Sequence, residues 1–305
     1  MQQRLTRYLI YGIILLAECT VVGYAQMPGK TMRQYRHVIK ALCADTLQGR
    51  EAGTVYEEQA GAMVSDWFSK VGFNPQIQKF TFRPADSTTT KNAANIYCYI
   101  NNNADSTILI SAHYDHLGMG SGRSRSLGKR GIHPGADDNA SGVALLMGLA
   151  QRYKQWRQPT YNYILVSYAA HEPGLFGSAA FSNYCKEHFP PVCMALNFDM
   201  VGRMDARSHA VTIYSQPAIP DTTGEKLGPL VGGVVYTDEP ERIFQTDCKT
   251  FAASGIRCLS LTTGLHEDYH KITDVPEKIN YNGIAIMQAF AEKILQQYPE
   301  IIHIR

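Results

Sequence analysis

Residues 111–142 constrain this chain more than any other part of its sequence. The stretch begins with His113-Tyr114-Asp115, directly after an apolar run at 107–110 that predicts a buried strand. It ends with Asp137-Asp138-Asn139, just before an apolar pattern of helical period. Open α/β sheets place their sites in loops at the carboxyl ends of strands. The histidine and carboxylates of this stretch are therefore candidate ligands for a borderline cation such as zinc.

Strand and helix patterns alternate along the rest of the chain, which predicts an α/β fold. We expect a mostly parallel, mixed central sheet with helices on both faces, a three-layer αβα arrangement. No linker or repeat follows residue 30, so residues 26–305 are expected to form one domain. The expected strands are 76–83, 95–100, 106–112, 163–170, 192–200, 210–214 and 257–262, and the expected helices are 31–45, 54–72, 139–156, 175–188, 247–254 and 281–298.

The N-terminus has the composition of a secretory signal. Arg4 and Arg7 precede an apolar run at 8–17, and Ala25 ends a small-residue site for a signal peptidase. We expect residues 1–25 to be removed, with export to the periplasm or the extracellular space and no membrane span afterwards. A retained anchor is the alternative, and a lipoprotein attached through Cys19 is a weaker one, because Glu18 stands where a small residue is expected.

Composition excludes few classes of function. The net charge of +2 argues neither for nor against nucleic-acid binding, but no basic helix with interleaved aromatics is present, so that function is not expected. Six cysteines follow the signal, an even number that permits disulfides, with Cys185 and Cys193 the closest pair. Several lie in apolar patterns, so buried free thiols are an equal alternative. The sequence does not indicate an oligomeric state.

Candidate metal ligands follow several of the expected strands. Each residue alone has a simpler explanation. Asp138, for example, could serve merely as the N-cap of the following helix. Together they form a set of imidazoles and carboxylates at one sheet edge, which could hold two divalent ions with one carboxylate bridging. Asp115, two residues from the first histidine on an extended chain, could orient that imidazole. The set is His113, Asp138, Glu172, Asp199 and His270.

The motifs AHYDHLG, PGADDNASG, HEPGLFGS, NFDMVGR and YHKITD resemble, in order, those of the M28 family of dinuclear zinc exopeptidases, which includes bacterial leucyl aminopeptidases. LQGREAGT is similar to the family's N-terminal segment. The resemblance implies two Zn²⁺, with Asp138 bridging, His113 and Asp199 on one ion, and Glu172 and His270 on the other. It also implies a cis peptide bond after Asp138, an orienting role for Asp115, and peptide or protein N-termini as substrates.

One position departs from the family pattern. The family has two adjacent glutamates, a general base followed by a ligand, whereas this chain has His171-Glu172. His171 could shuttle the proton itself, or bind metal as an extra ligand, or leave a site that binds peptide and hardly turns over. We expect a working hydrolase, because metal activation of water does not depend on the base. A peptide-binding pseudopeptidase and a glutaminyl-cyclase-like acyl transferase are the alternatives.

Overall fold

The computed structural model describes residues 29–120, 122–216, 231, 233–237 and 245–302; for 233–237 and 298–302 it describes only the backbone. The expected signal at 1–25 lies outside these residues. None of the described helices is long and apolar enough to cross a membrane.

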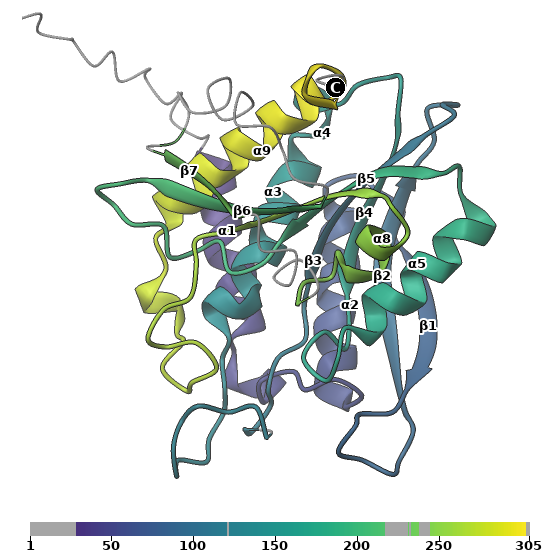
Figure 1. Ribbon diagram of the computed structural model, residues 1–305. Coiled ribbons are helices and arrows are strands. Elements are labelled where there is room, and N and C mark those ends of the chain that lie inside the picture. The colour runs from purple at the N-terminus through teal and green to yellow at the C-terminus, as the bar shows by residue number, and fades with distance from the viewer. Residues whose placement is uncertain (1–28, 121, 217–230, 232, 238–244, 303–305) are drawn as a thin grey trace, which may run out of the picture.

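Eight strands form one mixed sheet in the order β1-β2-β4-β3-β5-β8-β6-β7 (Figure 1). The four central strands β4, β3, β5 and β8 run parallel, while β2 joins β4 and β6 joins β8 in antiparallel fashion. This confirms the expected fold class. The strands are β1 (Gln76–Phe82), β2 (Lys91–Ile100), β3 (Thr107–His113), β4 (Asn162–Tyr168), β5 (Val192–Phe198), β6 (Ala210–Gln216), β7 (Gly233–Thr237) and β8 (Arg257–Thr262).

Helices cover both faces of the sheet (Figure 1). On one face, α3 packs against β3, β4 and β5 and is itself covered by α1 and α9, with α2 beside it on β2. On the other face, α5 packs on β1 and β2, and α8 on β8. The helices are α1 (Gly29–Leu42), α2 (Val55–Lys70), α3 (Gly142–Gln151), α4 (Tyr153–Trp156), α5 (Phe176–His188), α8 (Lys249–Ala253) and α9 (Tyr281–Ile302).

The helix expected over 139–156 is broken into three parts. A single turn, η2 (Ala136–Ser141), precedes α3, and α4 follows it. Within η2, Asp138 and Asn139 have non-helical backbone angles, so α3 begins only at Gly142. Every residue of α3 from Gly142 to Ala150 is buried, because the helix lies between the sheet and two other helices. Its composition, apolar all round, suits that position.

All six cysteines among the described residues are free thiols, and only Cys193 is partly exposed. The alternative of buried free thiols therefore holds in this structure, and no disulfide links Cys185 to Cys193. The cysteines lie in apolar surroundings between the sheet and its helices and behave as small core residues.

Candidate metal centre

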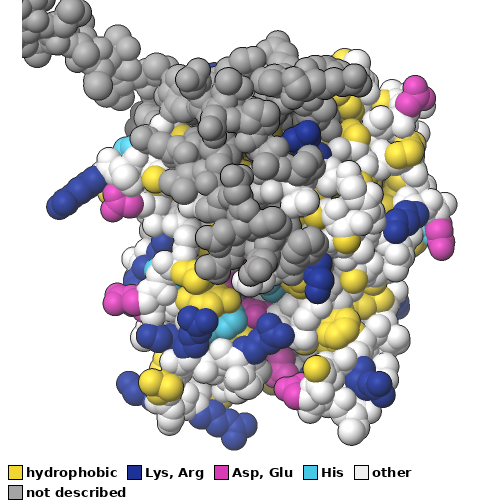
Figure 2. Space-filling view, in the orientation of Figure 1, with side chains coloured by type: hydrophobic (Ala, Val, Ile, Leu, Met, Phe, Trp, Pro, Cys, Tyr) yellow, Lys and Arg dark blue, Asp and Glu magenta, His cyan; other side chains and the backbone are white. Residues whose placement is uncertain are grey.

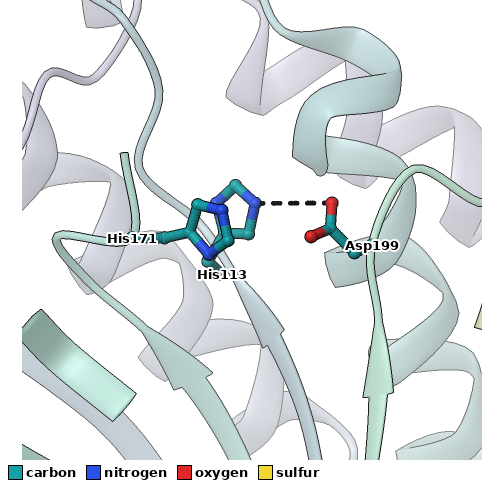
Figure 3. Close-up of side chains that lie close together, drawn as sticks. All are labelled: His113, His171 and Asp199. Carbon is teal, nitrogen blue, oxygen red and sulfur yellow. Dashed lines mark ion pairs between the residues drawn. The ribbon is translucent and has the colours of Figure 1, made fainter. Parts of the chain in front are cut away.

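The parallel strands deliver the candidate ligands to one edge of the sheet. His113 is the last residue of β3, Asp199 directly follows β5, and Glu172 follows β4 by four residues. His270 lies in the loop after β8. Because neighbouring parallel strands end at the same edge, these four positions meet there. Figure 3 shows the side chains of His113, His171 and Asp199 gathered at these strand ends.

Asp138 stands between two groups of side chains. Its Oδ1 lies 3.4 Å from His113 Nε2, which is 3.7 Å from Asp199 Oδ1. Its Oδ2 lies 3.2 Å from His270 Nε2, which is 3.3 Å from Glu172 Oε2. Each carboxylate oxygen of Asp138 therefore faces a different histidine, the arrangement that a bridging ligand requires. The structure thus brings all five candidate ligands together.

The donor set fits a pair of divalent cations. Two ligands on one tetrahedral zinc, each bonded at about 2.0–2.1 Å, lie about 3.3 Å apart. The separations of 3.2–3.7 Å around Asp138 are close to that value. His113 Nε2 is buried and has no hydrogen-bond partner among the described residues. A buried nitrogen that faces carboxylates and has no hydrogen-bond partner is suited to bind a cation.

The charges of the group also favour cations. Burial lowers the pKa of His113, but the carboxylates of Asp115, Asp138 and Asp199 outweigh it and raise the pKa well above 6.5. Burial likewise opposes protonation of His270, yet Asp138 and Glu172 raise its pKa to about 10. The same carboxylates that stabilise a proton on these rings stabilise a metal ion beside them.

The backbone around Asp138 is held by hydrogen bonds. A cis peptide bond joins Asp138 to Asn139, as the resemblance implies. The carboxylate of Asp274 accepts the backbone N–H groups of Asp137 and Asp138 at 2.9 and 3.0 Å. Asp138 does not cap α3, because Ser141 occupies the N-cap position. Its carboxylate is thereby left for the two histidines.

Asp115 connects two strand ends. Its Oδ1 accepts the backbone N–H of His171 at 3.0 Å and its Oδ2 that of Glu172 at 3.1 Å. Its Oδ1 lies 3.6 Å from Nδ1 of His113, whose nearer contact is the backbone oxygen of Asp115 at 3.3 Å. Asp115 therefore fixes the segment that carries His171 and Glu172 as well as facing the ring of His113.

His171 lies flat against His113 and has its own acidic partner. Its Nδ1 is 3.0 Å from Asp247 Oδ2, and Asp247 is fully buried just before α8. Burial and His113 oppose protonation of His171, but Asp247 and Asp199 raise its pKa to about 9. With Nδ1 bonded to a carboxylate, Nε2 is the nitrogen that can exchange a proton with a substrate.

Sequence reasoning missed several residues that support the centre. Arg50 is fully buried and donates to the backbone carbonyls of Tyr114, Leu42, Pro134 and Gly135. Arg50 lies within LQGREAGT and His116 within AHYDHLG, so those motifs contained a signal for both. Asp247 stands in no recognised motif, and only the fold brings it to His171.

Three comparisons place the chain among known proteins. A model described as Peptidase family M28 matches residues 95–295, more than half of the chain. A probable zinc metalloprotease of Pyrenophora teres f. teres (strain 0-1) is 27% identical over 165 residues, covering 52% of this chain and 33% of that protein. The chain spans about a third of the length of the first curated relatives it matches.

Solved structures share the fold. The aminopeptidase from Aneurinibacillus sp. strain AM-1 superposes with a TM-score of 0.69 at 15% identity, over 87% of this chain and 93% of that one. The Porphyromonas gingivalis glutaminyl cyclase superposes with a TM-score of 0.68 at 18% identity, over 88% of this chain and 98% of that one. At such identities the likeness establishes the fold alone. With the family match and the ordered motifs, it shows that this chain belongs to peptidase family M28.

Proposed function

We propose that this chain is a metal-dependent aminopeptidase, which hydrolyses the first peptide bond of peptide or protein substrates. The observation that supports this most directly is the convergence of two histidines and two further carboxylates on the two oxygens of Asp138. We further propose that residues 1–25 are a signal and that the enzyme acts in the periplasm or outside the cell.

The proposed cofactor is a pair of Zn²⁺ ions. His113 and Asp199 would hold one ion, Glu172 and His270 the other, and Asp138 both. Such ions, when bound, polarise a peptide carbonyl and lower the pKa of a bound water towards about 7. The free amino group of a substrate, in its neutral form, is a nitrogen ligand of the kind that zinc accepts, which would favour N-terminal over internal peptide bonds.

The protein's own part in the reaction is positioning and proton transfer. Asp115 holds the backbone that carries His171 and Glu172. Asp247 holds Nδ1 of His171. Bound cations would oppose the rise in the pKa of His171 that Asp247 and Asp199 cause, so that Nε2 would be unprotonated and could take a proton from the attacking water and deliver it to the leaving amine. In this proposal His171 acts as the general base in place of the glutamate that the family has at this position and this chain lacks.

Cavities on two sides of the centre offer room for a peptide. One of about 510 Å³ is lined by His116 and Glu172, and one of about 190 Å³ by His171 and Asp199. A peptide lying across the centre would have its scissile bond between them. Histidine, acidic and basic side chains gather on this face of the molecule (Figure 2). A third cavity, of about 970 Å³ between α2 and the β1–β2 hairpin, is not lined by any of the five candidate ligands.

A panel of aminoacyl substrates tests this function. Zinc-loaded protein should hydrolyse at least one N-terminal residue type, and a chelator should abolish the activity reversibly. N-terminally blocked versions of the same substrates should resist cleavage. Zinc-bound protein that cleaves none of the panel would contradict the proposal.

Because a glutaminyl cyclase has a similar fold, acyl transfer is a second candidate function that the experiment should also test. Peptides with N-terminal glutamine should be added to the panel, and ammonia release with ring closure should be measured beside hydrolysis. Cyclisation without hydrolysis would favour an acyl transferase. Tight peptide binding with neither reaction would favour a pseudopeptidase.

A further inference from the structure

We propose that His116 is a positioning residue, which holds the outer oxygen of Glu172 so that Glu172 offers its other oxygen to the second cation. The inference rests on the metal centre of the proposed function and deepens it. His116 is only 1% exposed, and its Nδ1 lies 2.9 Å from Glu172 Oε1.

The ring of His116 is held in place on several sides. Its backbone N–H donates to the carbonyl of Arg50 at 3.2 Å, and the chain pairs there with Glu51. Gly135 lies against the ring: a Cβ at that position would approach Cγ and Cδ2 of His116 to 2.5 Å. Only glycine leaves room for the ring, and the positive φ of 57° at Gly135 also suits glycine. The ring therefore has little freedom to leave Glu172.

Distances distinguish a hydrogen-bond partner from a metal ligand. Oε2 of Glu172 lies 3.3 Å from His270 Nε2, the separation of about 3.3 Å expected for two ligands of one zinc. Oε1, in contrast, lies 2.9 Å from His116 Nδ1, which is the length of a hydrogen bond. His116 Nδ1 is also 3.9 Å from Asp138 Oδ2, longer than the separations of 3.2–3.7 Å among the five candidate ligands, although ligand atoms of His116, Asp138 and Glu172 lie within 4.8 Å of one another. The two oxygens of Glu172 thus have different partners.

Because its two oxygens have different partners, the carboxylate of Glu172 is held on the side that faces away from the second cation site. The backbone N–H of Glu172 is bonded to Asp115, and Oε1 is bonded to His116. A ligand whose outer atoms are held needs less reordering when the ion arrives, and losing such a partner typically lowers metal affinity about 10–100-fold. His116 therefore contributes to metal affinity without binding the ion.

Metal binding of two His116 variants tests the proposal. His116→Leu removes the donor, and His116→Asn keeps an N–H donor near the position of Nδ1. Zinc affinity is measured by competition with a chromophoric chelator, without substrate. We expect His116→Leu to weaken one of two zinc sites about 10–100-fold and to leave the other unchanged, and His116→Asn to recover most of the loss. If His116→Leu does not fold, as judged by circular dichroism, His116→Ala replaces it.

The neighbouring buried histidine is the matched control. His133 bonds to Ser124 Oγ at 2.7 Å and to the Gly131 carbonyl, so His133→Leu should leave both zinc affinities within about twofold. Cobalt-substituted protein gives an independent readout: the visible spectrum of His116→Asn should match the wild type, since the ligands do not change.

Unchanged affinities in His116→Leu would overturn the proposal. So would an altered cobalt spectrum with no recovery in His116→Asn, which is the behaviour of a direct ligand. A wild-type protein that binds two zinc ions but cleaves no peptide would refute the proposed activity and leave this test valid. A wild type that binds no second ion would refute both.

Discussion

The imidazole ring of His171 stacks on that of His113, with ring centroids 3.7 Å apart and an angle of 8° between the planes (Figure 3). An imidazole nitrogen binds a metal along its lone pair, in the plane of the ring. Because the two rings lie in separate, nearly parallel planes, the lone pairs of their nitrogens do not converge on one point. Although nitrogen and oxygen atoms of His113, His171 and Asp199 lie within 4.8 Å of one another, the stacking disfavours His171 as a ligand of the same ion.

Replacing His171 separates proton transfer from metal binding. In His171→Gln we expect kcat to fall by about 10²–10⁴, because the general base is lost, while KM and zinc content stay near those of the wild type. Steady-state kinetics and elemental analysis of the same preparations give both values. A loss of one zinc with the activity would instead mean that His171 is a ligand.

The substitution His171→Glu restores the pair of adjacent glutamates that is usual in the family. We expect no large gain, because the new carboxylate would face Asp247, whose partner in this chain is an imidazole. A gain of a hundredfold or more in kcat would show that the natural protein is catalytically weakened, and would favour the pseudopeptidase.

Asp247 is expected to act through the orientation of His171. Asp247→Asn should lower kcat at least about tenfold with little change in KM, because an amide can hold the imidazole in the wrong tautomer. Nitrogen chemical shifts of His171 would report the tautomer directly. Asp45→Asn, at an exposed carboxylate in η1 (Asp45–Leu47), is the control and should leave kcat unchanged. A fall in KM alone would contradict the orienting role.

Arg50 ties together the loops of the centre. Its guanidinium bonds the carbonyls of Tyr114, Pro134 and Gly135, which flank His113 and Asp138 in the sequence. Arg50→Met should lower the free energy of unfolding by about 3 kcal/mol or more, because buried carbonyls lose their donors. Urea unfolding measures the effect. Arg33→Met, at an exposed position of α1, should change stability by less than about 0.5 kcal/mol. Equal effects of the two substitutions would contradict the role of Arg50.

Most of the fold could be predicted because each central strand is a mostly apolar run bounded by turns. The strands at Thr107–His113 and Asn162–Tyr168 are buried at every residue, as parallel strands covered on both faces require. The break before α3 could not be read from periodicity. The apolar pattern that begins after Asn139 does not show where the helix starts, because the backbone conformation there depends on contacts of Asp137 and Asp138 with Asp274. Strand β7 was also not anticipated.

The candidate ligands could be predicted because they follow parallel strands, whose ends meet at one edge. Their supporting residues could not be assigned in that way. Asp247 lies 76 positions from His171, and Arg50 is 85 positions from Gly135, so these contacts exist only after the layers pack. A histidine beside a motif, such as His116, shows no role until its distance to Glu172 is known.

Glu57 makes stability depend on pH. Its Oε1 lies 2.5 Å from the hydroxyl of Tyr114, which is also 2.8 Å from the carbonyl of Ala94. Burial raises the pKa of Glu57 from 4.5 to about 7, and hydrogen bonds from Tyr114 and Gly53 offset only part of this.

Because the pKa of Glu57 is higher in the folded protein than in the unfolded chain, the folded state binds the extra proton. The resulting stabilisation is complete below pH 4.5 and is lost as the pH rises through about 7. A shift of this size corresponds to about 3 kcal/mol. Glu57→Gln removes the titrating group. The free energy of unfolding of this variant, relative to that of the wild type, should therefore rise by about 3 kcal/mol between pH 4.5 and pH 8. Urea titrations of both proteins across that range measure it, with Glu58→Gln, at an exposed neighbouring position, as the control. Parallel pH profiles for wild type and Glu57→Gln would mean that the Glu57 carboxyl ionises in the folded protein as it does in the unfolded chain.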